Sequence, residues 1–236
     1  APVLREGDLT LERKVVLEEI AMVDDTPDDL VFELHNELLW GDHPYGYSIL
    51  GTRESVAGLG VSELRALHTQ GYQPQHIVVA AAGHVAHDVL IDALRRTGWE
   101  DVPRGDAAPA FAPVPEAVAP VVRHVNREAA QTQIVFGAPT LRYGDRRRYA
   151  LTLASSILGG GMSSRLFQRV REAMGLAYSV SSFHSYNTDS GAHGVYLATS
   201  PETAAQAVDA VRDELRLASR EGFTDEEVVA GKGQLK

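Results

Sequence analysis

Cysteine is absent from this chain of 236 residues. Its absence excludes a disulfide framework, a thiolate nucleophile and a thiolate metal site, so any metal ligand must be histidine, aspartate or glutamate. Long apolar runs are absent too. The longest, IVVAAA at 77–82, is far shorter than the about 18 residues that a membrane-spanning helix needs, and no export signal is visible at the N-terminus. These absences favour a cytoplasmic protein with no membrane partner.

Basic charge is scarce. The chain has 22 Lys and Arg against 32 Asp and Glu, which gives a formal net charge of -10. A protein that binds nucleic acid or an anionic membrane needs a basic face, so both classes of partner are excluded. The one dense basic run, DRRR at 145–148, is interpreted as the solvated face of a helix.

Proline is concentrated in one place. Residues 103–120 hold five of the eleven prolines among alanines, and such a segment sustains neither helix nor sheet pairing. We therefore predict a linker at 103–120 between a first domain at 1–102 and a second domain at 121–236.

Strands and helices mix along the chain without a strict βαβ alternation, so we expect an α+β fold. We also expect two related domains, each with helices packed on a mostly antiparallel or mixed sheet. Strands are expected at about 76–83, 121–127, 131–137, 176–184 and 192–199. Helices are expected at about 9–24, 28–39, 61–71, 86–97, 145–158, 163–174, 202–220 and 225–235.

A faint internal repeat relates REGDLTLERKVVLEE at 5–19 to REGFTDEEVVAGKGQ at 220–234. In each, a Gly-containing turn and a residue able to cap a helix precede a helical pattern. If the repeat is real, the first domain lacks its front half and the second lacks its back half. The start also enters a helical pattern within ten residues, and the end stops inside a helical pattern with no terminating signal. We therefore expect a central part of a longer polypeptide, with exposed apolar surface that promotes self-association.

The segment ERKVVLEEIAM at 12–22 carries two unusually placed carboxylates. At about 100° per residue, Glu12 and Glu19 project from the middle of an apolar arc; the arc consists of Leu11, Val15, Val16, Ile20, Met22 and Val23. A carboxylate facing a core must be protonated, paired or metal-bound. The alternative is that the helix lies at a surface and both glutamates are solvated.

The segment GGGMSSRLFQRVREAMGLAYSV at 159–180 begins with a glycine turn and reverses at Gly175. It is no phosphate loop, because the Lys of GxxxxGK[ST] is missing. The reversal places Tyr178 back toward Arg171 in the last helical turn. A core tyrosine and an arginine that interacts with the helix dipole explain the same pattern.

Together, the two segments resemble the pitrilysin and insulinase family of zinc metallopeptidases, especially its mitochondrial processing peptidase-like bacterial branch. ERKVVLEEI resembles the family's E-R-x-V-V-x-x-E segment, HPYGYSILG its following loop, and residues 159–180 its second-domain signature. The resemblance implies that Glu19 is the third zinc ligand and that Glu12 orients a neighbouring ligand. It also implies that Arg171 and Tyr178 act on the carbonyl of a peptide substrate, where a cation and a phenol donor stabilise an oxyanion.

One part of the family pattern is missing. The family's H-x-x-E-H motif supplies two histidine ligands and the general base, and none occurs among the nine histidines of this chain. HVAH at 84–87 has the nearest spacing but no acidic partner in register, and His43 and His184 are interpreted as structural. Because zinc sites need three or four protein ligands, this chain alone is expected to hold no stable zinc and to cleave no peptide.

Three hypotheses remain. The first is a central part of a zinc metalloendopeptidase that cleaves peptides or presequences inside a chamber between paired halves. In this case the missing N-terminal segment or a paired subunit is a partner, and the complete protein is a dimer. The second is a non-catalytic subunit that forms a wall of such a chamber, although carboxylates kept on an apolar face speak against it. The third is an unrelated α+β binding domain, which the long match at 159–180 disfavours.

Overall fold

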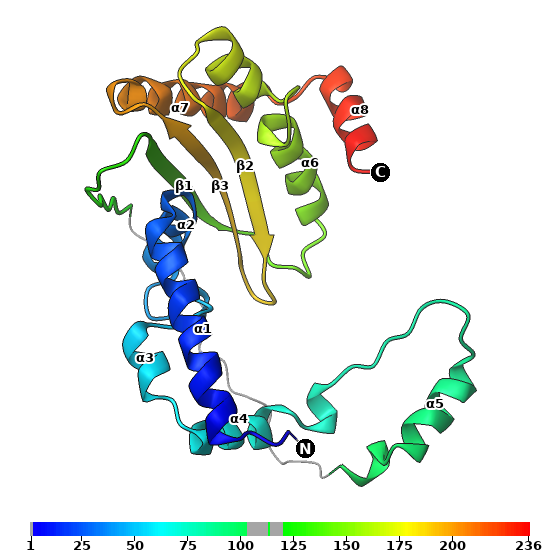
Figure 1. Ribbon diagram of the computed structural model, residues 1–236. Helices are drawn as coiled ribbons and strands as arrows, with labels where there is room; N and C mark the ends of the chain where they lie inside the picture. Colours follow the sequence, from blue (N-terminus) through cyan, green and yellow to red (C-terminus); the bar gives the residue numbers. More distant parts are fainter. Residues whose placement is uncertain (1, 103–112, 114–119) are drawn as a thin grey trace. The chain divides into compact units, whose positions relative to one another are not determined.

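The computed structural model describes residues 2–102, 113 and 120–236 (Figure 1). The chain divides into two compact units, one made of Ala1–Ile20 and Leu50–Ala112 and the other of Ala21–Ile49 and Pro113–Lys236. This division differs from the expected domains at 1–102 and 121–236, because Ala21–Ile49 groups with the second half of the chain. Most of the expected linker lies outside the described residues.

The first unit is helical in its described part. It contains most of α1 (Glu6–Asp25), then α3 (Arg53–Gly58), α4 (Val61–Gly71) and α5 (His87–Arg96), with short 3₁₀ turns η2 (Pro74–His76) and η3 (Trp99–Asp101). Local signals explain these bounds. Thr52 and Ser55 form a reciprocal capping box at the start of α3, which satisfies backbone N–H groups that have no partner inside the helix. The guanidinium of Arg13 in α1 donates to the carbonyl oxygens of Val56 and Leu59 at 3.2 and 2.6 Å.

Two expected strands are wrong. Residues 76–83 and 121–127 form no strand in the structure, and Val78 and Val122 are 91% and 77% exposed. Both segments have the β-branched composition of strands. A strand also needs a neighbour to pair its backbone groups, and among the described residues the only ladders join β1, β2 and β3.

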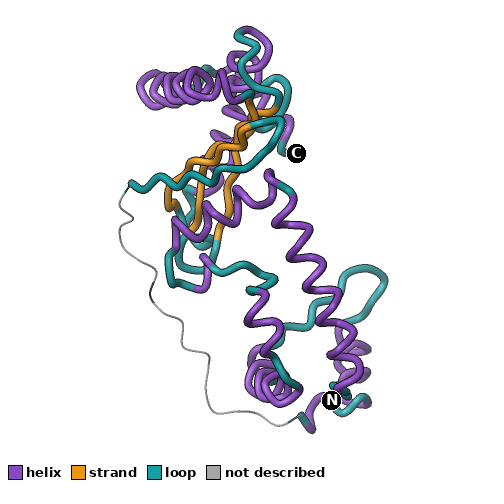
Figure 2. The backbone as a smooth tube through the Cα atoms, turned by 60° about the vertical axis from the view of Figure 1, so that its left-hand side comes forward, coloured by secondary structure: helices purple, strands orange, loops and turns teal. Residues whose placement is uncertain are grey.

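The second unit is built on an antiparallel sheet with the strand order β1-β3-β2, formed by β1 (Thr132–Thr140), β2 (Ser179–Tyr186) and β3 (Gly191–Thr199). Its other elements are α2 (Pro27–Trp40), η1 (Pro44–Gly46), α6 (Arg148–Gly159), η4 (Phe167–Ala173), η5 (Pro201–Thr203), α7 (Ala204–Glu221) and α8 (Asp225–Gln234). The strands lie side by side in both views (Figures 1 and 2). Central β3 pairs Val195 with Phe136 on one side and with Ser182 on the other.

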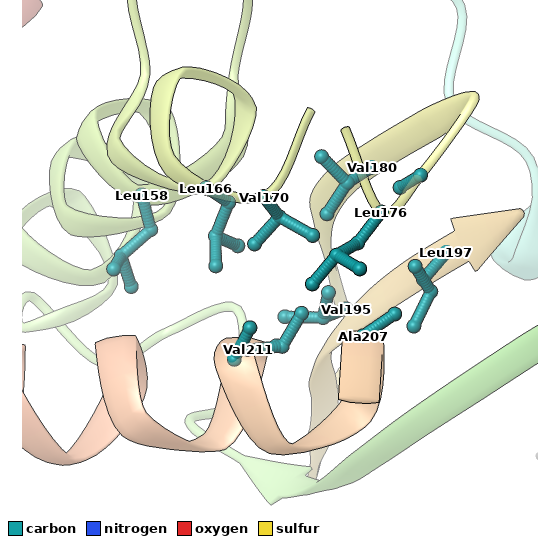
Figure 3. Packing of buried hydrophobic residues seen from close by; sticks show 11 residues of the cluster. Leu158, Leu166, Val170, Leu176, Val180, Val195, Leu197, Ala207 and Val211 are labelled. Carbon is teal, nitrogen blue, oxygen red and sulfur yellow. The ribbon is translucent and has the colours of Figure 1, made fainter. Parts of the chain in front are cut away.

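One face of this sheet forms the main hydrophobic core (Figure 3). Val195 and Leu197 of β3 are 1% and 0% exposed. They pack with Val211 of α7 and with Leu166 and Val170 of the segment that contains η4. Val195 and Leu197 are buried together because residues two apart along a strand point to the same face of the sheet. The expected helix at 163–174 is in fact π-helical over Phe167–Ala173.

The opposite face is covered by α2. The Phe32 ring lies 5.2 Å from the Phe183 ring and 5.5 Å from the Tyr196 ring, measured between centroids. The His35 ring packs against Gly137 of β1, which has no side chain. A Cβ added at Gly137 would lie only 2.8 Å from the His35 Nε2. This packing places Ala21–Ile49 in the second unit.

The α+β fold class is confirmed, with helices packed on an antiparallel sheet. Within the part of the chain that the structure describes, no helix combines the length and the apolarity needed to cross a bilayer.

Candidate functional site

The structure brings Arg171 and Tyr178 together. The guanidinium carbon of Arg171 lies 5.6 Å from the centre of the Tyr178 ring and 4.8 Å from the centre of the Phe167 ring. Both distances fit cation–π contacts. The Tyr178 side chain is 69% exposed, and Arg171 is also exposed. The tyrosine is therefore not a core residue.

Backbone geometry produces this contact. Gly175 has a φ of +62°, a left-handed conformation that glycine adopts without strain. The chain reverses there, with the amide of Gly175 donating to the Arg171 carbonyl at 3.1 Å and the amide of Leu176 donating to the Val170 carbonyl at 2.9 Å. The amide of Tyr178 then donates to the Ala198 carbonyl at 2.8 Å, immediately before β2 begins.

Glu12 and Glu19 lie on α1 and both are exposed. Of the two interpretations of this segment, the structure favours the one in which both glutamates are solvated. Leu11, Val15 and Met22 are 65%, 51% and 71% exposed, and Ile20 is the only buried residue of this helix. The arc is apolar but uncovered in this chain, so neither carboxylate is forced to find a partner by burial.

The described residues do not form a complete metal site. Over 2–102, 113 and 120–236, no three histidine, aspartate or glutamate side chains are grouped so that they could hold an ion. Glu19 alone does not fit zinc, because stable zinc sites in proteins need three or four ligands. The structure therefore gives no basis for assigning a metal-dependent step to this chain by itself.

The histidines named from the sequence make local contacts. His43 Nδ1 accepts a hydrogen bond from the Tyr45 amide at 3.2 Å and caps η1. His184 Nδ1 lies 3.2 Å from the Ser155 hydroxyl. Both of these histidines have structural roles, as expected. His84 and His87 are exposed.

An ion-pair cluster beside η4 was not foreseen. Arg165 pairs with Glu227 through two hydrogen bonds of 2.5 and 2.7 Å, and Arg165 and Arg169 both approach Glu214, at 3.6 and 2.8 Å. The Arg165 guanidinium holds the pKa of Glu227 at about 2, while the Glu227 carboxylate raises the pKa of Arg165. The one local signal of this cluster in the sequence is the T-x-x-E capping pattern at 224–227, which indicates the start of a helix.

A shallow hollow lies elsewhere in the second unit, with a volume of about 560 Å³. The Tyr45 hydroxyl donates to an Asp189 oxygen at 2.6 Å near its margin. None of the residues that line the hollow is a site residue expected from the sequence. The lining consists of Tyr45, Tyr143, Gly144, Tyr186, Asn187 and Thr188.

Comparison with known proteins decides the family. Residues 59–235 match the model described as "Peptidase M16 inactive domain". This chain belongs to the M16 peptidase family. An "uncharacterized zinc protease" of Mycobacterium tuberculosis is 41% identical over 231 residues, which are 97% of this chain and 53% of that relative. The "uncharacterized zinc protease YmxG" of Bacillus subtilis is 36% identical over 98% of this chain and 56% of its own length.

Solved structures have the same fold. The M16 inactive domain from Pseudomonas fluorescens matches with a TM-score of 0.91 at 24% identity, over 99% of this chain and 57% of that one. A protease from Helicobacter pylori matches with a TM-score of 0.88 at 21% identity, over 98% and 57%. This M16 chain spans about half the length of the curated relatives it matches.

Proposed function

We propose that this M16 chain supplies the substrate-contacting Arg171–Tyr178 pair and one zinc ligand, Glu19, to a zinc-dependent metalloendopeptidase. The other metal ligands and the general base would come from elsewhere in the complete protein. The contact between the Arg171 guanidinium and the exposed Tyr178 ring carries the proposal. The names of the relatives, each an "uncharacterized zinc protease", support it.

The chemistry of the pair suits peptide hydrolysis. A guanidinium and a phenol both donate hydrogen bonds, and here they are adjacent and accessible to a substrate. Donors aimed at a carbonyl oxygen stabilise the negative charge that develops there in the transition state. The guanidinium group is a planar cation with several N–H donors. Peptides or presequences are the proposed substrates.

Glu19 would contribute a single carboxylate, and Glu12, one heptad earlier on the same helix, would orient a neighbouring ligand. Their exposure leaves both carboxylates free to meet groups outside this chain. A missing N-terminal segment or a paired subunit is the proposed source of those groups, and a dimer is the proposed assembly.

A second function is a non-catalytic subunit that forms a wall of such a chamber. Two observations favour it: the matching family model describes an inactive domain, and the described residues contain no group of three metal ligands. In this alternative, Arg171 and Tyr178 would bind a peptide without taking part in its cleavage.

The decisive experiment extends the chain at its N-terminus with a segment that carries H-x-x-E-H and measures zinc content and peptide cleavage. We expect chelator-sensitive cleavage, and about 10²-fold slower turnover for Tyr178→Phe, the loss typical of one oxyanion donor. Tyr149→Phe is the matched control, because Tyr149 is similarly exposed at 64%. Unchanged turnover of Tyr178→Phe would refute the role of this tyrosine.

The metal assignment has its own control pair. Glu19→Gln should remove zinc from the extended protein, while Glu18→Gln, at the adjacent and also exposed position of α1, should retain it. Elemental analysis of both variants after dialysis measures the difference. Full zinc and activity in Glu19→Gln would overturn the ligand assignment, and an extended protein that neither binds zinc nor cleaves peptides would support the non-catalytic function.

A further inference from the structure

The π-helical segment η4 needs an explanation, because it carries Arg171. Its wide turn is marked by the Met174 amide, which donates to the carbonyl of Arg169, five residues earlier, at 3.1 Å. Such turns are rare, occur within α-helices as local insertions, and are frequent at functional sites. Unless neighbouring contacts hold the wide turn, the chain is expected to relax to ordinary α-helical hydrogen bonding.

Contacts fix the chain on both sides of Arg171. Before it, Arg169 donates to Glu214 of α7 at 2.8 Å, and the Val170 side chain is fully buried. After it, the Thr199 hydroxyl of β3 donates to the Leu176 carbonyl at 2.6 Å. The residues between these two anchors must therefore span a fixed distance. The direction of Arg171 therefore depends on where Arg169 is held.

Glu214 is the centre of the first anchor. Its side chain is 5% exposed, and its two oxygens face different arginines, Arg169 at 2.8 Å and Arg165 at 3.6 Å. A buried carboxylate is stable only when cations and hydrogen bonds satisfy it. Arg165 and Arg169 are four residues apart, about one helical turn, so they reach the same carboxylate from one side of the helix.

Arg165 connects this centre to a third element. Its guanidinium forms a two-point contact with Glu227 of α8, donates to the Gly222 carbonyl at 3.1 Å, and lies 5.0 Å from the Phe223 ring centre. Paired hydrogen bonds from arginine to a carboxylate restrict orientation as well as distance. The cluster thus joins η4, α7 and the first turn of α8.

We propose that Glu214, through Arg169 and Arg165, is a positioning residue that holds η4 in its π-helical form and so directs Arg171 over Tyr178. Without the carboxylate, the segment relaxes toward α-helical bonding. A change of one residue in register turns the following side chains by about 100°, which moves the Arg171 guanidinium away from the Tyr178 ring. The importance of that contact for catalysis rests on the proposed function.

The test uses this chain without metal or substrate, so its result is independent of whether the protein is a peptidase. Aromatic rings shift the NMR signals of protons held above them, and Arg171 lies over Phe167 and Tyr178. In Glu214→Gln, the ring-induced shifts of the Arg171 side chain should be largely lost well below the melting temperature. Exchange of the Met174 amide proton with solvent should also become faster.

Asp213→Asn is the matched control, since Asp213 lies on the same helix and pairs with Arg216 at the surface, where their side chains are 57% and 72% exposed. It should leave the Arg171 signals unchanged. A merely stabilising role of Glu214 would lower the melting temperature with the native Arg171 shifts intact, and that result would overturn the proposal. If Glu214→Gln fails to fold, the same Arg171 signals are measured in Glu227→Gln. The Glu227 side chain is 28% exposed, and loss of the Arg171 shifts in that variant would support the proposal, whereas native shifts would overturn it.

Discussion

The substitution Gly159→Ala has two effects of opposite sign on the free energy of unfolding. Gly159 is the last residue of α6, and replacing a helical glycine with alanine stabilises a helix by up to about 1 kcal/mol. In this fold, a Cβ at Gly159 would lie 2.3 Å from the Ser182 backbone nitrogen and 2.9 Å from the Ser181 carbonyl carbon of β2. Both are backbone atoms of a paired strand, so neither moves away by a simple rotation.

The steric effect should win. Forcing extra volume into a packed interior costs about 1–3 kcal/mol and at times more, and here the new contact is with backbone. Because both contacts are with backbone, the cost should lie at the upper end, about 3 kcal/mol. After a gain in helix propensity of up to about 1 kcal/mol is subtracted, we expect Gly159→Ala to lower the free energy of unfolding by about 2 kcal/mol. With a urea dependence of about 2 kcal/mol per molar, the unfolding midpoint should fall by about 1 M.

Trp40 fluorescence is a suitable measurement. The chain has two tryptophans, and Trp40 is 3% exposed in the same unit as Gly159, so a Trp99→Phe background isolates its signal. Gly233→Ala in α8 is the control, because its Cβ would meet nothing within 4 Å and it should be neutral or stabilising. An unchanged or higher midpoint for Gly159→Ala would refute the packing argument.

Two further predictions concern the second unit. Burial between α2 and the sheet lowers the pKa of His35 below 6.5, with the neighbouring Asn36 opposing the shift in part. The unfolded chain therefore binds more protons, so stability should be complete above about pH 6.5 and decline as the pH falls below it. His35→Gln should flatten that decline in urea titrations from pH 7 to 5, whereas exposed His84→Gln should leave it unchanged; an equally steep decline in both would contradict the assignment. Leu197→Ala, at a fully buried position, should cost about 2–5 kcal/mol in the same assay, and a loss below 1 kcal/mol would mean that the core collapses around the cavity.

Sequence reasoning was reliable where the signal was local. The strands β1, β2 and β3 and helices such as α4 and α7 lie within a few residues of the expected ranges, because periodicity and caps act over one or two turns. The reversal at Gly175 that brings Tyr178 to Arg171 could also be predicted from the sequence. The segment at 159–180 indicated the family before any comparison.

Reasoning from local pattern failed where the outcome depended on a distant partner. Residues 77–82 have a strand's composition but no strand beside them among the described residues, and Val78 is exposed. The apolar arc of α1 is uncovered, and only tertiary contacts could decide this, because the sequence allowed both a covered and a solvated interpretation. The Arg165–Glu227 pair joins residues 62 apart, a separation that no single-sequence pattern encodes.

The sequence by itself determined the strands β1, β2 and β3, helices such as α4 and α7, the absence of thiol chemistry, the family resemblance and the Arg171–Tyr178 reversal, all of which follow from residues near one another in the chain. Only the tertiary structure decided that α2 packs on the sheet, that Glu12 and Glu19 are solvated, and that Glu214 holds two arginines beside η4. Burial and pairing are set by which distant segments meet, because a side chain leaves water only where another part of the molecule covers it.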